Sequence, residues 1–156
     1  GLRGRTLTEL VSSLDITATI LDYAGLEKTG MMQGSSLLPL VKDEDAEWRD
    51  YLFLESLFTM RDNPFCEGIR QGKWKYIRMF DGIMPYMEKD IDFQNRDPAF
   101  EQLFNLEEDP GERNNLAGKY EGSALLDSLR SLCARHSTEL NQARQIYKTT
   151  VDISGR

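Results

Sequence analysis

One long amphipathic segment near the end of the chain limits the folds that this sequence can adopt. From Ser123 onward, apolar residues recur at helical spacing for about six turns. The stripe consists of Leu125, Leu129, Leu132, Leu140, Ala143 and Tyr147. Charged residues such as Arg130 and Glu139 fall off this stripe. We therefore expect a single long helix that packs one side against a sheet.

Three upstream segments carry the pattern of β-strands. Residues 51–57, YLFLESL, are a short apolar run with aromatic content, which is typical of a central strand. Residues 65–80, FCEGIRQGKWKYIRMF, predict a hairpin that turns at Gln71-Gly72. Residues 101–106, EQLFNL, predict a further strand. The sheet is therefore expected to be small and mainly antiparallel.

A short helix is expected near the start of the chain. Ser12 or Ser13 caps its beginning, and Gly25 stands where a left-handed residue commonly ends a helix. Its apolar face is formed by Ile16, Ile20, Tyr23 and Ala24. The predicted fold class is α+β: a small, mainly antiparallel sheet packed against a long C-terminal helix, with a short N-terminal helix. At 156 residues, the chain has the length of one domain.

The stretches between these elements read as connections. Residues 27–41 are expected to be turn-rich, since Gly34 and Pro39 interrupt regular structure. Leucines at positions 37, 38 and 40 provide buried anchors there. The acidic run at 42–50 is expected to be a solvated turn or linker. Residues 82–99 show no clean period and predict a long surface excursion.

The charge of the chain argues against two classes of partner. The formal net charge is −7, with no basic face, so neither a general nucleic-acid binder nor a protein of anionic membrane surfaces is expected. The segment KWKYIR interleaves lysines with aromatic residues, as some single-strand binders do. Here Trp74 and Tyr76 alternate with Lys73 and Lys75, which places the aromatics in the core and the lysines in water. No apolar run approaches the roughly 18 residues of a membrane span.

Few residues suggest catalysis. His136 is the only histidine, and its spacing places it on the helix stripe, as expected of a histidine at the core boundary. Cys66 lies in a strand pattern and Cys133 beside the stripe, so two thiols are favoured over a disulfide, although the sequence does not choose between them. The acidic runs lack the spacing of a calcium loop. By its own chemistry, the chain is expected to be non-catalytic.

Four segments, read in order, resemble a known family. These are LVSSLDITATILDYAG, MQGSSLLPLV, EGIRQGKWKYI and EQLFNLEEDPGERNNLA, which are spread over residues 10–117. They are similar to the C-terminal marks of the type I sulfatases, within the alkaline-phosphatase-like superfamily. One departure is Ala18, which stands where the family usually has proline, a change that touches no catalytic residue.

The resemblance implies that the chain is the C-terminal domain of a sulfatase, over residues 1–156. Sulfatases of this family use a formylglycine made from Cys or Ser in a C/S-x-P/A-x-R motif, with Asp and Asn ligands for calcium or magnesium. Neither CEGIR nor CARHS fits that motif, and no Asp-Asn metal pair is present. The resemblance therefore implies no cofactor in this chain, and a full-length protein that needs both the metal and the formylglycine.

The resemblance also implies partners and one candidate site. The expected partners are the protein's own N-terminal catalytic domain and a sulfated small molecule or glycan. Residues 59–63, TMRDN, and the excursion at 82–99 are where a substrate-cleft rim is expected. Arg61, Asp62 and Asn63 are its candidate residues, with Arg61 pairing with a sulfated sugar. A solvated loop arginine is the plainer interpretation of Arg61.

Two alternatives stay open from the sequence. A related phosphodiesterase or phosphonate hydrolase would share this C-terminal part, because the residues that select the ester lie elsewhere. A free-standing carbohydrate-binding or interaction module would instead show an exposed aromatic platform, whereas Trp48 and Trp74 are expected to be largely buried. The chain lacks an initiating Met and is expected to be a piece of a longer protein, which such enzymes often export or place in the periplasm.

Overall fold

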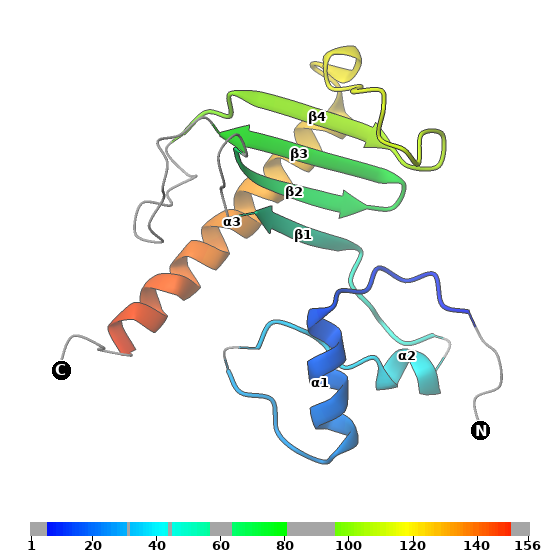
Figure 1. Cartoon of the computed structure of the whole chain (residues 1–156), viewed down its shortest axis with the longest axis vertical. Coiled ribbons are helices and arrows are strands. Elements are labelled where there is room, and N and C mark those ends of the chain that lie inside the picture. The colour runs from blue at the N-terminus through cyan, green and yellow to red at the C-terminus, as the bar shows by residue number, and fades with distance from the viewer. Residues whose placement is uncertain (1–5, 31, 44, 57–63, 81–95, 151–156) are drawn as a thin grey trace. The chain divides into compact units, whose positions relative to one another are not determined.

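Two compact units make up the chain. The computed structural model describes residues 6–30, 32–43, 45–56, 64–80 and 96–150. The first unit runs from Gly1 to Leu52 and the second from Phe53 to Arg156. Figure 1 shows helices α1 and α2 in the first unit, and the sheet with helix α3 in the second. The α+β class predicted from the sequence is confirmed.

The first unit is built around α1, Leu14–Tyr23. The hydroxyl of Ser12 accepts a hydrogen bond from the backbone N–H of Leu14 at 3.3 Å, and Gly25 ends the helix with a φ of 70°. Both features match the expected helix boundaries. The face that turns inward is different from the predicted one, since Asp15 and Ala18 are its buried residues.

A second short helix, α2, Leu38–Lys42, lies in the stretch expected to be irregular. Pro39 is at its first turn, where the missing N–H costs nothing, so the proline opens this helix rather than preventing it. Leu40 is buried, as expected, whereas Leu37 and Leu38 are half-buried. Gly34 approaches α1 so closely that a Cβ there would lie 2.1 Å from the Leu14 carbonyl oxygen.

The second unit contains a four-stranded antiparallel meander in the order β1-β2-β3-β4. The strands are β1, Tyr51–Ser56; β2, Phe65–Gln71; β3, Trp74–Phe80; and β4, Phe100–Asn105. The β2–β3 hairpin turns at Gly72, whose φ is 51°, next to the predicted point. β1 was expected to be a central strand, but it lies at the edge of the sheet.

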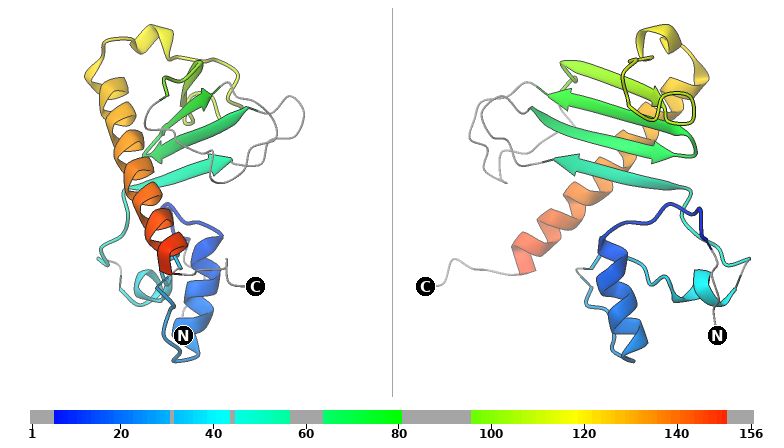
Figure 2. Two further views of the ribbon diagram at one scale, coloured as in Figure 1. Left: turned by 90° about the vertical axis from the view of Figure 1, so that its left-hand side faces the viewer. Right: turned by 45° about the vertical axis from the view of Figure 1, so that its right-hand side comes forward.

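Helix α3, Ala124–Thr150, covers one face of the sheet, as the two views of Figure 2 show. The side chains of β2, β3 and β4 alternate, and the set that faces α3 forms the core with it. This core contains Phe65, Ile69, Tyr76, Phe80, Leu103, Leu126, Leu129, Leu132 and Cys133. The stripe of α3 differs in part from the predicted one: Leu126 and Cys133 are buried, while Leu125 is half-buried and Ala143 is exposed.

Candidate functional site

The predicted rim residues lie outside the described part of the chain. Arg61, Asp62 and Asn63, and the excursion up to residue 95, belong to the ranges that the structure does not describe. The described residues of the second unit hold four other features that could serve a site: a buried ionic network, a partly exposed ionic network, a polar loop and the face of the sheet opposite α3.

The most buried ionic network joins β2, β3 and α3. Glu67 is 1 % exposed and accepts two hydrogen bonds from the guanidinium of Arg78, at 2.8 and 2.6 Å. The other carboxylate oxygen accepts a bond of 2.7 Å from the hydroxyl of Ser137 on α3. Burial raises the pKa of Glu67, and the bonds from Arg78 and Ser137 oppose that rise. Every oxygen of Glu67 is thus occupied by protein, which suits a clamp rather than a catalytic acid.

A second network lies closer to the surface, between β4 and α3. Glu101 binds the guanidinium of Arg130 through both oxygens and accepts a further bond from the hydroxyl of Tyr76. Arg130 also reaches Glu121, just before α3, at 2.9 Å. The bond from Arg130 is the main reason that the pKa of Glu101 lies below its usual value. Burial and the bond to Glu101 raise the pKa of Tyr76, so its phenol stays protonated.

The polar loop FNLEEDPGERNNLA, residues 104–117, is fixed by two side chains. Oδ2 of Asp109 accepts bonds of 2.8 Å from the backbone N–H groups of Arg113 and Asn114, which closes the turn at Pro110 and Gly111. Oδ1 of Asn115 accepts from the N–H groups of Leu103 and Ala117, each at 3.0 Å, and its Nδ2 donates to the carbonyl of Glu101 at 2.9 Å. The loop is therefore a structural clip along β4.

Glu112 shows the strain that this loop carries. It is the one non-glycine residue among the described ones with a positive φ, 53°. Its carboxylate accepts bonds of 2.9 and 2.7 Å from Nζ of Lys75 on β3. The ion pair holds the left-handed backbone in place and leaves Lys75 occupied, so this lysine is not available for an anion.

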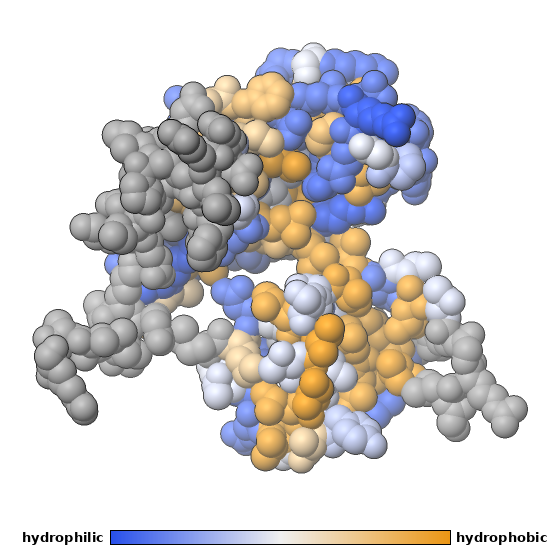
Figure 3. Space-filling view, viewed as in Figure 1, coloured by the Kyte–Doolittle hydropathy of each residue, from blue (hydrophilic) through white to orange (hydrophobic). Residues whose placement is uncertain are grey.

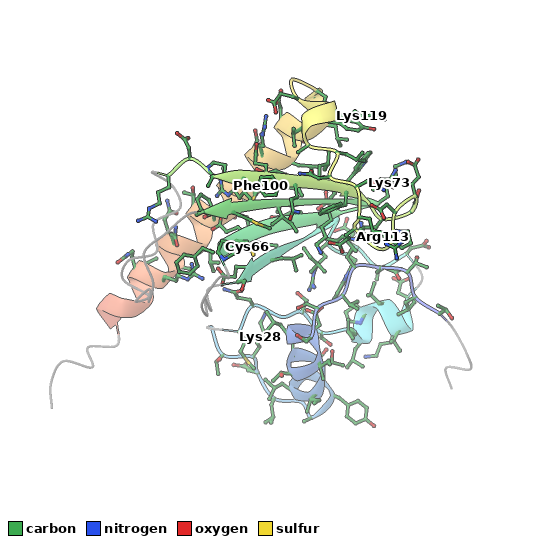
Figure 4. The ribbon with its side chains drawn as sticks, turned by 45° about the horizontal axis from the view of Figure 1, so that its top comes forward. Lys28, Cys66, Lys73, Phe100, Arg113 and Lys119 are labelled. Atoms are coloured by element: carbon green, nitrogen blue, oxygen red, sulfur yellow. The ribbon has the colours of Figure 1, made fainter. Side chains whose placement is uncertain are left out.

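The face of the sheet opposite α3, which no described helix or strand covers, contains a shallow hollow. Its volume is about 190 Å³, and it is lined by Leu54, Ser56, Cys66, Gly68, Lys75 and Ile77. Figure 4 shows Cys66 and Phe100 along this sheet, with α3 behind it. Leu54 and Phe100 are 41 % and 51 % exposed. Its lining also includes Glu55 and Glu67, which are paired with Arg144 and Arg78, and the lysine is paired with Glu112. The described lining residues therefore form no catalytic pair.

Neither cysteine is an activated nucleophile, and both are free. Burial raises the pKa of the Cys66 thiol, and it raises that of Cys133 to about 12. The two side chains lie on opposite sides of the sheet, since Cys66 alternates with Phe65 and Glu67, which face α3. The two thiols favoured from the sequence are thus confirmed.

His136 lies at the edge of the core, as predicted. Its ring stacks on Phe53 of β1, with centroids 4.5 Å apart and an interplanar angle of 23°. Burial lowers its pKa, so the ring is mainly neutral at pH 7. The two tryptophans were expected to be largely buried, but both Trp48 and Trp74 are half-buried. The indole N–H of Trp48 donates to the Leu10 carbonyl at 2.9 Å, and Trp74 packs edge-on against Tyr120.

The first unit contains one ion pair that the sequence did not reveal. Asp15, fully buried, binds the guanidinium of Arg49 through two bonds of 2.7 Å. It also accepts from the backbone N–H groups of Ser12 and Ser35, at 2.7 and 2.8 Å. Burial raises the pKa of Asp15, but these bonds outweigh burial and hold it below its usual value. The run at 42–50, expected as a solvated linker, is therefore anchored at Arg49.

The described ranges offer no metal centre, because nowhere in them do three His, Cys, Asp or Glu side chains converge. None of the described sites provides the set of oxygen ligands that a calcium or magnesium ion needs. Within the same ranges, no helix is both long and apolar enough to cross a bilayer.

The comparisons with known proteins agree with one another. The family model described as "N-sulphoglucosamine sulphohydrolase, C-terminal" matches residues 2–139. An arylsulfatase of Clostridium perfringens is 29% identical over 85% of this chain and 24% of its own length. An N-acetylglucosamine-6-O-sulfatase of Bacteroides thetaiotaomicron is 26% identical over 97% of this chain and 25% of its own length.

A solved structure gives the same result for the fold. It is described as a complex with "its substrate D-Glucosamine-2-N, 6-O-disulfate", and it superposes with a TM-score of 0.61 at 25% identity. The match covers 82% of this chain and 24% of that one. The chain thus spans about a quarter of the length of the curated relatives and of the solved structure that it matches.

Proposed function

The chain belongs to the N-sulphoglucosamine sulphohydrolase C-terminal family, and from this premise we propose that it is the C-terminal part of an enzyme that hydrolyses sulfuric esters. The observation that carries the proposal is the match of the family model over residues 2–139.

The proposed substrate is a sulfated carbohydrate or an aryl sulfate. The relatives named above are an arylsulfatase and an N-acetylglucosamine-6-O-sulfatase, and the solved structure is a complex with a sulfated glucosamine. These names support the class of ester. They do not select one sugar or one sulfate position for the enzyme that contains this chain.

The proposed role of the chain is structural, with one edge at the substrate cleft. The reacting groups would lie in the N-terminal part: a formylglycine nucleophile and a calcium or magnesium ion held by Asp and Asn side chains. The raised pKa of both thiols and the occupied oxygens of Glu67 support this division, since neither thiol is activated as a nucleophile and this buried carboxylate is fully bonded to protein.

Arg61, with Asp62 and Asn63, is proposed to form the rim that contacts the anionic substrate. An arginine binds a sulfate through two parallel hydrogen bonds, and lysine does not reproduce that geometry. In the full-length enzyme, Arg61→Ala is expected to lower kcat/KM about tenfold, mostly through KM. Arg113→Ala, in the exposed loop after Gly111, is the matched control and is expected to leave both constants unchanged. Unchanged kinetics for Arg61→Ala would remove the rim proposal.

The function is tested by assaying the full-length protein and the 156-residue chain side by side. Both are given calcium and a chromogenic aryl sulfate, with a phosphodiester and a phosphonate ester as parallel substrates. We expect calcium-dependent sulfate release by the full-length protein and none by the chain alone. Preference for a phosphorus ester would favour the related hydrolases instead, and turnover by the chain alone would place a nucleophile among its own residues.

A further inference from the structure

An apolar face of α1 is left uncovered in the first unit. We name it the α1 apolar face and define it by Ile16, Ile20 and Tyr23, which follow one another at i, i+4 and i+7. Their exposed fractions are 57 %, 62 % and 84 %. Together with Ala24, Leu37 and Leu38 they line a hollow of about 390 Å³. Figure 3 shows hydrophobic residues gathered on the visible surface of this unit.

The exposure of this face cannot be relieved by rotating α1 about its own axis. The opposite side of α1 is fixed by Asp15, which makes two bonds to Arg49 and two to backbone N–H groups. Rotating Ile16 and Ile20 inward would carry this carboxylate out of all four bonds. The sequence and its internal contacts therefore commit α1 to presenting its apolar stripe outward, where another surface has to cover it.

The unit is also too small to be complete. Among its described residues, the buried apolar side chains are Ala18 and Leu40, and the most extensive buried contact is the ionic one at Asp15. About 50 residues with so little apolar burial do not normally offset the entropy of folding. The unit resembles a piece of a larger core rather than a domain.

The chemistry of the hollow specifies what covers it. Two lining residues, Thr19 and Tyr23, carry a hydroxyl. That of Thr19 already donates to the Asp15 carbonyl at 2.6 Å and accepts from the Leu37 N–H at 2.9 Å. No described side chain of the lining carries a charge. The surface therefore offers mainly contacts to aliphatic or aromatic side chains, and a sulfated or otherwise charged ligand would find no partner of opposite charge among the described lining residues.

We propose that the α1 apolar face is the surface by which residues 6–52 pack into the N-terminal, catalytic part of the sulfatase. This inference rests on the proposed function. The chain spans about a quarter of its relatives' length, and its family model is that of a C-terminal region, so the remaining three quarters are the source of an apolar partner surface. Residues 6–52 would then belong structurally to the catalytic part, and the C-terminal domain proper would begin near Phe53.

The test compares thiol labelling in the full-length protein and in the 156-residue chain. Ile20→Cys places a thiol at the centre of the α1 apolar face, and Asp22→Cys places one on the same helix outside it. Each labelling rate is measured with a maleimide at low protein concentration and divided by the rate in denaturant. Maleimide labelling of the unsubstituted protein corrects for Cys66 and Cys133.

We expect Ile20→Cys to react about tenfold or more slowly in the full-length protein than in the chain alone, because only local opening would expose it. Asp22→Cys is expected to react at similar rates in both, since a charged position stays in water. Equal rates for Ile20→Cys in the two proteins would overturn the proposal. Protection in the chain alone that grows with concentration would also overturn it, in favour of a second copy as the occupant.

The outcome is separable from that of the proposed function. Sulfate release is measured on the same full-length preparation. Protection of Ile20→Cys in a protein without sulfatase activity would keep the docking surface and reject the reaction. An active sulfatase with a freely reactive Ile20→Cys would do the reverse.

Discussion

Ser137 on α3 donates a hydrogen bond of 2.7 Å to Glu67 on β2, across 70 positions of sequence, while Arg78 of β3 binds the other carboxylate oxygen. This relationship joins the helix to the two central strands through a single buried carboxylate. A misaligned α3 could not make it, because a shift by one residue turns Ser137 away from the sheet.

Removing the hydroxyl is expected to weaken the fold. Ser137→Ala leaves Oε1 of Glu67 buried without its donor, at a cost of about 1–2 kcal/mol in the free energy of unfolding. Ser131→Ala, at an exposed position of the same helix, is the matched control and should be neutral or slightly stabilising. Urea unfolding followed by circular dichroism measures both. Equal stabilities of the two variants would mean that the bond adds nothing.

Glu67→Gln is expected to cost more than Ser137→Ala. It leaves the guanidinium of Arg78, 8 % exposed, without its charge partner, and such losses cost about 3–5 kcal/mol. A double variant, Glu67→Gln with Ser137→Ala, tests the network as a unit. Non-additive losses are expected, because both changes act on the same carboxylate.

Glu101 predicts how stability depends on pH. Its folded-state pKa is lowered, chiefly by Arg130, so it contributes stability that is present above its unfolded pKa of about 4.3 and is lost as the pH falls through the folded value. Glu101→Gln should therefore cost about 1 kcal/mol at pH 7 and progressively less below pH ~4, given the partial exposure of the pair. Denaturant unfolding from pH 7 to pH 3 measures the difference. A constant difference across that range would contradict this account.

Close approach of two strands makes Gly68 necessary. A Cβ at this position would lie 2.6 Å from the carbonyl oxygen of Tyr76, which is backbone and cannot rotate away. Gly68→Ala is expected to destabilise the chain by about 1–3 kcal/mol. Gly118→Ala is the control, because a Cβ there meets nothing within 4 Å. Thermal unfolding that ranks the two variants equally would show that the strands separate at little cost.

The Asn115 clip can be tested in the same way. Asn115→Ala removes two hydrogen bonds between the loop and β4 and one within the loop, and a loss of about 2 kcal/mol is expected. Hydrogen exchange should accelerate most at the Leu103 and Ala117 amides. Asn114→Ala, an exposed neighbour, is the control. Unchanged exchange at those two amides would contradict the assigned role of Asn115.

The parts of this structure that could be predicted from the sequence are those that local pattern determines. Alternation fixed the faces of Trp74 and Tyr76, and a glycine marked the hairpin turn at Gly72.

The parts that failed depend on long-range partners. The apolar face of α1 was read correctly as a stripe, but periodicity does not say whether a cover is present, and Ile20 proved exposed. β1 looked central by composition, while its place at the edge depends on the order of pairing. The bond between Asp15 and Arg49 joins residues 34 positions apart, and no local signal announces it. Arg61 falls outside the described residues and stays a prediction.

The sheet that separates Cys66 from Cys133 has a consequence for how the domain is made. The two thiols can meet only if the strands between them separate. The folded chain therefore forms no disulfide between Cys66 and Cys133, in reducing or in oxidising surroundings. The chain needs no oxidant or disulfide isomerase to reach its fold, and a preparation from a reducing cytoplasm should match one from a secretory route. The sheet therefore keeps the two sulfur atoms apart.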